Sequence, residues 1–293
     1  MLEVKTADKA GFCFGVRRAI DLAEKTVTKN HKVYTLGPII HNPQEVKRLE
    51  KKGIKILNTL KKIKDGYVIL RTHGIPFKLH QQLEKNKDIV VIDATCPFVK
   101  RTQDIVKQLS TDIENYNKKI IVVVGERIHP EVVALVSYGN GNCTVIENTN
   151  EAQNFKKSGK LNIVSQTTQT PKNFNDIVKI LKKNYKVKIF NTICKAALDR
   201  QKAAEKLAET VDLMIIIGGK NSGNTTRLAQ ICSNKTKAYH IETVNDIKER
   251  WLLNVNSIGL TAGASTPDWI INEVEIKMRE TNTNKNKQNK TNF

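Results

Sequence analysis

Short apolar runs alternate with amphipathic segments along nearly the whole chain. The run IIVVV at 120–124 has the length and the β-branched composition of a strand buried in a parallel sheet. In the segments between such runs, apolar residues recur at helical spacing, as they do at Val16, Ile20, Ala23 and Val27. Strands that alternate with amphipathic helices predict an α/β fold built on parallel sheets.

One order of these elements occurs three times. Each copy starts with a cysteine and a helix, continues through a strand, a polar loop and a second helix, and then has two strands, a second polar loop, a third helix and a final strand. The copies start at Cys13, Cys96 and Cys194. The third copy lacks its final strand, and the strand expected near residues 2–6, which runs toward Cys13, can take that place. The repeat therefore predicts units that close into a ring.

The repeat divides the chain into three pseudo-symmetric α/β units, each with a small, mostly parallel sheet. The expected ranges are 13–95, 96–193, and 194–280 together with 1–12. The remaining residues, 281–293, are polar and rich in Asn, Lys and Thr, which predicts a disordered tail.

Polar side chains follow the predicted strands, at the edge where open α/β sheets bind ligands. The cysteine turns hold Cys13, Cys96 and Cys194. The loops after the first strands hold His41, then His129 with Glu131, then Ser222 and Asn224. The loops after the third strands hold His73, then Thr167 and Thr168, then Ser265. If the three units pack around one axis with these edges inward, all of these groups converge.

Three converging thiolates without a fourth indicate a metal centre with one open position. Zinc could be held in this way, and an iron–sulfur cube with three cysteine ligands would leave one iron open to a substrate. A cysteine in such a fold is otherwise most often a small buried apolar residue, and this is what we expect for Cys143 and Cys232.

The histidines divide in the same manner. His41, His73 and His129 follow predicted strands, whereas we expect His31, His80 and His240 to be structural or solvated. Imidazole, hydroxyl and amide donors at helix N-termini suit a phosphorylated anion. The loop GGKNSGNTT has neither of the two common nucleotide-binding spacings, so a nucleotide cofactor is not expected.

The composition narrows the class of protein. The formal charge is +20, which attracts anions such as nucleic acid, a phosphorylated substrate or an acidic protein. The lysines are scattered and no basic run alternates with aromatic residues, so a dedicated nucleic-acid surface is not expected. No apolar run is long enough to cross a membrane, and the N-terminal residues MLEVKTADKA resemble neither a signal nor a transit segment. We therefore expect a cytoplasmic protein with no membrane partner.

Over about residues 1–280 the chain resembles the LytB family, the 4-hydroxy-3-methylbut-2-enyl diphosphate reductases. The motifs that carry the resemblance are GFCFGVRRA, LGPIIHNP, THGIP, DATCPFV, HPE at 129–131, SQTTQT, NTIC, KNSGNTTRL and TAGASTPD. The resemblance implies an oxidoreductase that removes the substrate hydroxyl with two electrons and yields isopentenyl and dimethylallyl diphosphate. This is the last step of the methylerythritol phosphate route to isoprenoids.

The resemblance also implies a site. The three α/β units would form a trefoil around one central [4Fe–4S] cluster per chain, held by Cys13, Cys96 and Cys194 with one open iron. The substrate diphosphate would be bound by His41, His73, His129, Ser222, Asn224 and Ser265. Thr167, with Thr168 beside it, would contact the hydroxyl end, and the catalytic residues would be Glu131, which delivers protons, Thr167 and His129. Some family members have serine where this chain has Gly223, so a backbone contact would replace a hydroxyl there.

Two other functions are compatible with the residues alone. One is a zinc hydrolase that acts on a phosphorylated small molecule with three thiolates and Glu131 as base. The other is a basic nucleic-acid-binding protein, for which charge is the only support. For the reductase we expect a monomer, a small-molecule diphosphate substrate, and an acidic electron donor such as a flavodoxin or ferredoxin.

Overall fold

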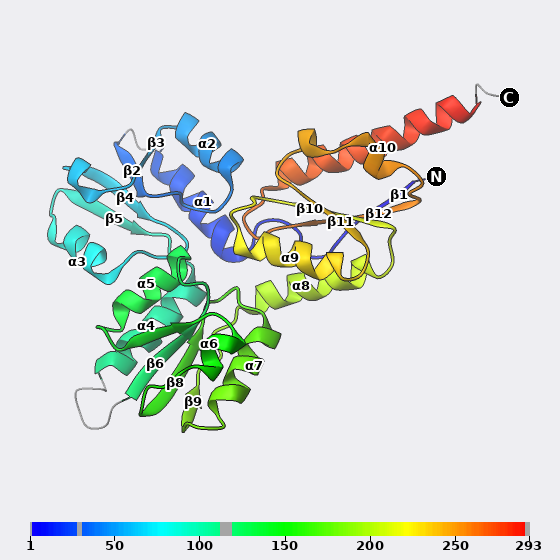
Figure 1. Cartoon of the computed structure of the whole chain (residues 1–293). Helices are drawn as coiled ribbons and strands as arrows, with labels where there is room; N and C mark the ends of the chain where they lie inside the picture. The colour runs from blue at the N-terminus through cyan, green and yellow to red at the C-terminus, as the bar shows by residue number, and fades with distance from the viewer. Residues whose placement is uncertain (1, 28–30, 112–118, 291–293) are drawn as a thin grey trace. The chain divides into compact units, whose positions relative to one another are not determined.

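The computed structural model describes residues 2–27, 31–111 and 119–290, with side chains up to residue 280. The chain forms two compact units (Figure 1). The first unit contains the described residues up to Arg17, residues 41–48, and those from Lys195 onward; the second contains 18–40 and 49–194.

The second unit has two four-stranded parallel sheets. The strands of one sheet, in the order β3-β2-β4-β5, are β2 (Val33–Leu36), β3 (Ile54–Leu57), β4 (Gly66–Leu70) and β5 (Ile89–Asp93). Those of the other, in the order β7-β6-β8-β9, are β6 (Lys119–Val124), β7 (Cys143–Ile146), β8 (Lys160–Ser165) and β9 (Val187–Ile189). In both sheets, the strands of a repeat, numbered by their order in the chain, therefore lie side by side in the order second, first, third, fourth.

The first unit has a third parallel sheet with this same order. Its strands are β10 (Leu213–Ile217), β11 (Lys237–Ile241), β12 (Ser257–Ala262) and β1 (Glu3–Thr6). β1 pairs in parallel with β12, from Glu3 opposite Ser257 to Thr6 opposite Leu260. The N-terminal strand thus completes the sheet of the third repeat. The predicted α/β class with three small parallel sheets is confirmed, whereas the three domain boundaries and the ring they would form stay predictions.

The helices lie where the apolar periodicity predicts them. Their bounds are α1 (Phe14–Val27), α2 (Pro43–Lys51), α3 (Phe77–Lys85), α4 (Pro97–Thr111), α5 (Pro130–Tyr138), α7 (Pro171–Leu181), α8 (Lys195–Ala208), α9 (Gly223–Ser233) and α10 (Asp268–Lys290). Four short helices were not predicted: α6 (Thr149–Gln153), η1 (Leu60–Lys62), η2 (Val244–Asp246) and η3 (Glu249–Leu252). Segments of three to five residues are too short to show helical periodicity.

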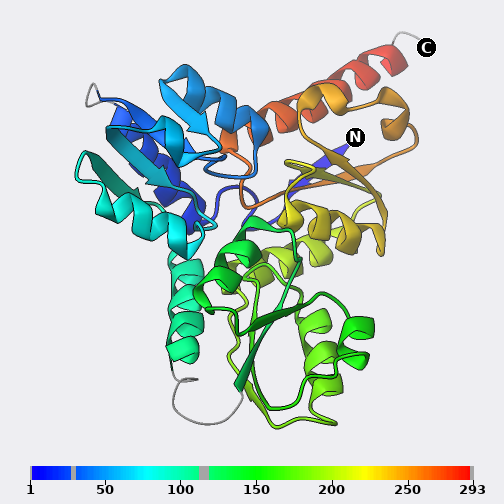
Figure 2. The ribbon, with the colours of Figure 1, turned by 60° about the vertical axis from the view of Figure 1, so that its left-hand side comes forward.

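The C-terminal segment differs from the prediction of a disordered tail. Helix α10 continues as a single helix to Lys290, as Figures 1 and 2 show, while residues 291–293 lie outside the described residues. No glycine or proline interrupts the sequence from 268 to 290, and its lysine, glutamate and glutamine residues favour a helix.

Strand β10 shows how the core is built. All five of its residues are buried. Ile215 and Ile217 pack in one cluster with Ile270 of α10, whereas Met214 lies in another cluster with Leu228 of α9. Helices therefore cover both faces of the sheet, which is why its central strand reads as a continuous apolar run.

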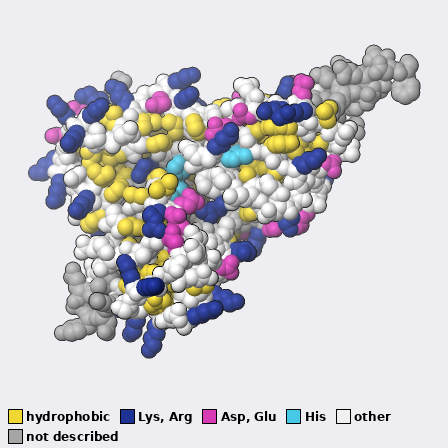
Figure 3. All heavy atoms as spheres, viewed as in Figure 1, with side chains coloured by type: hydrophobic (Ala, Val, Ile, Leu, Met, Phe, Trp, Pro, Cys, Tyr) yellow, Lys and Arg dark blue, Asp and Glu magenta, His cyan; other side chains and the backbone are white. Residues whose placement is uncertain are grey.

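The surface is basic but mixed. Figure 3 shows Lys and Arg side chains dispersed over the visible face, with acidic side chains between them. Several lysines and arginines of the chain form ion pairs, such as Lys32 with Asp65 and Lys235 with Glu209. Among the described helices, none combines the length and the apolar character that a membrane crossing requires.

Candidate active site

The three cysteines of the repeat are held by the same backbone contact. In each case the cysteine N–H donates to the carbonyl of the second residue after the third strand of a sheet: Cys13 to Ala264 (3.1 Å), Cys96 to Thr72 (3.0 Å) and Cys194 to Thr167 (2.8 Å). Each cysteine directly precedes a helix, and each is partly exposed. The three thiols therefore occupy equivalent places, at the carboxyl edge of a sheet and at a helix N-terminus, where anions are favoured.

The loops after the first strands are equivalent as well. A glycine follows each strand and its N–H donates to the last residue of the neighbouring strand: Gly37 to Leu57 (2.8 Å), Gly125 to Ile146 (3.2 Å) and Gly218 to Ile241 (2.9 Å). Four positions later stand His41, His129 and Ser222. The structure thus assigns these three predicted residues to one position of the repeat.

Glu131 and Thr167 form a buried pair in the second unit. The Thr167 N–H donates to Glu131 Oε1 at 2.6 Å, and the Thr167 hydroxyl donates to Oε2 at 2.9 Å. Glu131 is only 1% exposed. Glu131 lies in the first turn of α5 and Thr167 follows β8, so the pair joins the two polar loops of this sheet. A carboxyl group enclosed in this way is suited to hold and pass a proton.

The two histidines of the second unit that belong to the predicted site, His73 and His129, are oriented by their own loops. His129 caps α5, because its Nδ1 accepts the Glu131 N–H at 3.1 Å, and the proton of the neutral ring therefore lies on Nε2. The Thr72 hydroxyl donates to the Ile39 carbonyl at 3.0 Å and contacts His73 Nδ1 at 3.4 Å. The two imidazole rings lie edge to face, with centroids 5.6 Å apart.

Thr168 is positioned by Gln166, a residue that the sequence reasoning missed. The buried Gln166 amide donates to the Thr168 hydroxyl at 3.0 Å, and its carbonyl accepts the Glu126 N–H at 3.0 Å. Gly125 leaves the space for this amide, since a Cβ there would lie 2.8 Å from Gln166 Cβ. The sequence feature that could have identified Gln166 is its position in the motif SQTTQT, directly before Thr167.

The start of α9 gathers polar groups in the first unit. Ser222 caps the helix, with its hydroxyl accepting the Thr225 N–H at 3.4 Å, and Gly223 is half-buried beside it. Asn224 is 5% exposed, yet among the described residues neither its Oδ1 nor its Nδ2 has a hydrogen-bond partner. A buried unpaired amide is costly unless a ligand or water satisfies it, so this turn is suited to bind a polar ligand.

The loop that carries Ser265 is fixed to this turn. Ser265 is buried, and the neighbouring Thr266 hydroxyl donates to the Ile217 carbonyl at the end of β10, at 2.9 Å. A Cβ at Gly263 would collide with the Thr225 hydroxyl, so glycine permits the loop to lie directly against α9. The two polar loops of this sheet are therefore joined, as they are in the second unit.

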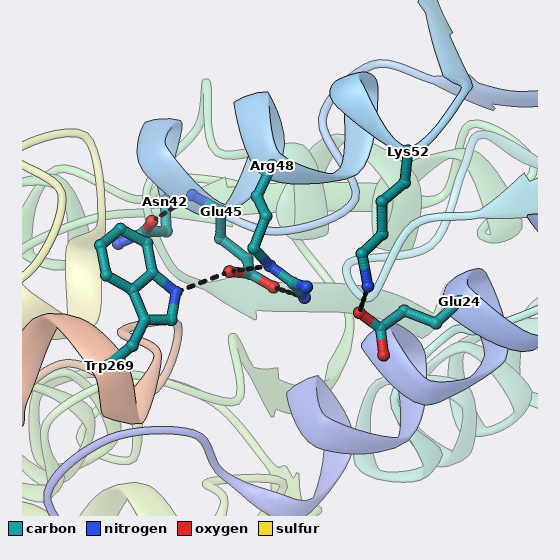
Figure 4. A network of polar contacts seen from close by, with 6 residues as sticks. All are labelled: Glu24, Asn42, Glu45, Arg48, Lys52 and Trp269. Atoms are coloured by element: carbon teal, nitrogen blue, oxygen red, sulfur yellow. Dashed lines mark hydrogen bonds and ion pairs between the residues drawn. The ribbon is translucent and has the colours of Figure 1, made fainter.

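His41 lies on a segment held by a carboxylate network, also in the first unit. The buried Glu45 carboxylate accepts hydrogen bonds from Trp269 Nε1 at 3.2 Å and from Arg48 Nε at 2.9 Å (Figure 4). Asn42 Oδ1 accepts the Glu45 N–H at 2.8 Å and so caps α2. This network ties the start of α2 to α10, and sequence patterns gave no sign of it.

Cysteines and histidines outside the predicted site have structural surroundings. Cys232 is fully buried, Cys143 is partly buried, and burial raises the pKa of each thiol to about 12. His240 Nε2 lies 2.9 Å from the Gly218 carbonyl, and the His31 ring stacks on Tyr67. His80 lies 3.8 Å from the exposed Glu84. The sequence-based expectation of a buried Cys232 is confirmed.

Each unit thus gathers its own part of the predicted site. The second unit contains Cys96, Cys194, His73, His129, Glu131, Thr167 and Thr168. The first contains Cys13, His41, Ser222, Gly223, Asn224 and Ser265. That the two sets converge stays a prediction. Within the described residues, no group of three or more His, Cys, Asp or Glu side chains is arranged to hold a metal ion. Thiolates around a four-iron cube bind different iron atoms and so lie farther apart than the ligands of one ion.

Comparison with known proteins gives a consistent result. The family model described as LytB protein matches residues 4–279. The 4-hydroxy-3-methylbut-2-enyl diphosphate reductase of Geobacter metallireducens is 46% identical over 283 residues, which cover 95% of this chain and 98% of that protein. The enzyme of the same name from Aquifex aeolicus is 45% identical over 96% of this chain and 97% of its own length.

Two solved structures resemble the chain. One is an (E)-4-hydroxy-3-methyl-but-2-enyl diphosphate reductase described as the terminal enzyme of the non-mevalonate pathway, with 44% identity, a TM-score of 0.68, and coverage of 96% of this chain and 100% of that one. The other is the E-1-hydroxy-2-methyl-but-2-enyl-4-diphosphate reductase of Plasmodium falciparum, with 30% identity, a TM-score of 0.85, and coverage of 95% and 87%.

Proposed function

The chain belongs to the LytB protein family, and on that premise we propose that it reduces (E)-4-hydroxy-3-methylbut-2-enyl diphosphate to isopentenyl and dimethylallyl diphosphate. The reaction consumes two electrons and two protons and releases the substrate hydroxyl as water. The relatives named above are reductases, so neither the zinc hydrolase nor the nucleic-acid-binding alternative has support from them.

The observation that carries this proposal is the equivalence of Cys13, Cys96 and Cys194. Each is a partly exposed thiol with the same backbone contact, whereas Cys143 and Cys232 lie in apolar clusters. A donor set of three thiolates without a fourth fits a [4Fe–4S] cluster with one open iron. When bound, the cluster supplies the electrons and a Lewis-acidic position for the reaction.

The diphosphate-binding role rests on donors at helix N-termini. The Asn224 amide, which has no hydrogen-bond partner among the described residues, lies with the Ser222 hydroxyl and the Gly223 N–H at the start of α9. The imidazoles of His41, His73 and His129 and the Ser265 hydroxyl add further donors. Hydrogen bonds of this kind to phosphate oxygens are charge-assisted and fix the orientation of the carbon chain.

The proton role belongs to the Glu131–Thr167 pair. Hydroxide is a poor leaving group, so the carbon–oxygen bond breaks most readily when the oxygen receives a proton. Glu131 donates that proton, and the Thr167 hydroxyl, which contacts Glu131 Oε2, relays it to the substrate oxygen. His129 accepts the Glu131 N–H through its Nδ1 and so fixes the turn that carries the acid.

The test begins with protein purified without oxygen. Iron, acid-labile sulfide and zinc are measured per chain, together with the visible spectrum and the reductase activity. About four irons and four sulfides per chain, with turnover of the substrate, are expected. Stoichiometric zinc in a colourless protein would overturn the proposal, because the reaction would then have no source of electrons.

The partners and the compartment belong to this same proposal. The electron donor is an acidic flavodoxin or ferredoxin, since the chain carries a formal charge of +20. The enzyme works as a monomer in the cytoplasm on its small-molecule diphosphate.

A further inference from the structure

A second pocket, of about 390 Å³, lies in the second unit at the carboxyl ends of β2, β3 and β4. Leu36 and Gly37 at the end of β2 line it, as does Arg71 directly after β4. In the strand order β3-β2-β4-β5, the strand that follows β2 in the chain, β3, is its neighbour on one side, and the next strand, β4, is its neighbour on the other side. The boundary between β2 and β4 is therefore a topological switch point, where open α/β sheets bind ligands.

The pocket is distinct from the residues proposed to bind substrate. Neither His41 nor His73 lines it. Gly37 and Arg71, however, begin the two loops that carry those histidines. Both loops therefore begin at the pocket and continue to a residue of the proposed substrate site.

The polar part of the wall suits an oxyanion. Two cations, Lys61 and Arg71, line the pocket, and none of the described residues that line it is acidic. The half-buried Arg71 donates from Nε to the Gly74 carbonyl at 2.9 Å. A Cβ on Gly37 would lie 3.1 Å from Arg71 Nη1, so glycine leaves the guanidinium space against the wall. Burial lowers the pKa of Arg71.

The rest of the wall is mixed. Leu36, Leu60, Ile75 and Leu79 form an aliphatic surface, and Asn58, Thr59 and Gln82 add neutral polar side chains. The volume lies within the range of small-molecule sites, roughly 300–1,000 Å³. A guanidinium and an ammonium beside an aliphatic surface recognise a ligand that has an anionic head and an apolar body.

We propose that this pocket binds an organic phosphate ester with an aliphatic body, and that its occupancy adjusts the His73 loop. Arg71 directly precedes Thr72, whose hydroxyl contacts His73 Nδ1. Arg71 also holds the turn from the other side, through the Gly74 carbonyl. An anion on the guanidinium therefore pulls on the turn that presents His73 to the substrate. The binding itself is independent of the proposed function, whereas the effect on the substrate site rests on it.

The test uses oxidised holoenzyme saturated with the diphosphate substrate, without reductant, so that the substrate site is occupied and no turnover occurs. Geranyl monophosphate is the probe, and calorimetry measures its affinity. Lys61→Ala removes an exposed cation of the pocket, and Lys62→Ala is the matched control from the same short helix, outside the pocket. Arg71→Lys keeps the charge and removes the guanidinium; thermal unfolding checks that this variant is folded.

We expect one probe per chain, bound equally by the wild type and Lys62→Ala and at least about tenfold more weakly by Lys61→Ala and Arg71→Lys. Inorganic phosphate should bind at least about tenfold more weakly than the ester, because it has no apolar body. Absence of binding, loss of binding on substrate saturation, or equal affinity in all four proteins would overturn the site.

Steady-state kinetics test the second half of the proposal. The probe should change KM for the substrate in the wild type and in Lys62→Ala but not in Lys61→Ala. Binding of the probe with unchanged KM and kcat in the wild type would refute the effect on the His73 loop. If no protein reduces the substrate, the proposed function fails, and the calorimetric result on the pocket remains decisive by itself.

Discussion

Replacement of Glu131 by glutamine removes the ability of this side chain to donate an acidic proton and keeps its size and its hydrogen bonds. Both Glu131 oxygens accept hydrogen bonds from Thr167, at 2.6 and 2.9 Å. A glutamine preserves both contacts, because its carbonyl accepts the Thr167 N–H while its amide donates to the Thr167 hydroxyl, which turns to accept. Hydrogen bonds to charged groups contribute about 1.5–3 kcal/mol and neutral ones about 1 kcal/mol, so over the two contacts we expect a loss of unfolding free energy of about 1–4 kcal/mol.

The effect on turnover should be far larger than the effect on stability. A positioned general acid contributes roughly 10²–10⁴-fold to a rate. We therefore expect Glu131→Gln to retain iron, sulfide and substrate affinity while kcat falls by about 10²–10⁴-fold, which is about 2.7–5.4 kcal/mol in activation free energy. Anaerobic steady-state kinetics with a chemical reductant measure this, and Glu84→Gln, at an exposed glutamate of the same unit, is the control. A kcat within about threefold of the wild type would remove Glu131 from the proton path.

Four further outcomes are expected. Cys96→Ser should lose both the cluster and the activity, and a variant that keeps its iron and sulfide content would contradict the ligand assignment. His41→Asn should weaken substrate binding by about tenfold or more, measured by calorimetry, through one lost charge-assisted contact; unchanged affinity would refute that contact. Cys143 and Cys232, with pKa values of about 12, should resist iodoacetamide in the native protein at about pH 8 and react only as the pH approaches that value, which peptide mass spectrometry would detect. Trp269→Phe should lower the unfolding free energy by about 1.5–3 kcal/mol in urea titrations, through the hydrogen bond lost to the Glu45 carboxylate; an unchanged unfolding midpoint would mean that this bond adds nothing to stability.

The threefold repeat could be read from the sequence because it is a local signal. Runs such as Leu213–Ile217 are apolar throughout, since helices cover both faces of the strand, and polar loops follow them at regular places. The positions of Cys13, Cys96 and Cys194 in that pattern are enough to predict that they are equivalent. In the structure, this equivalence is seen as the same hydrogen bond from each cysteine N–H, at 2.8–3.1 Å.

Contacts between loops could not be read in this way. Periodicity reports which side of an element is buried, but not which residue of another loop it meets. The sequence placed Glu131 and Thr167 in separate loops, and only the structure shows their direct contact. The same holds for Trp269 and Glu45, which lie far apart in the sequence. Segments too short for periodicity, such as Thr149–Gln153, were missed for a related reason.

The hydrogen bond between Trp269 and Glu45 also provides an intrinsic fluorescence probe. The chain has two tryptophans, and the other, Trp251, stacks on Tyr239 with ring centroids 3.9 Å apart. In a Trp251→Phe variant, the only remaining indole would be that of Trp269, which donates to Glu45 on α2, the helix that starts two residues after His41. Its fluorescence depends on the nearby carboxylate, so emission would change when that helix moves. Substrate capture could then be followed in stopped-flow mixing with no attached dye.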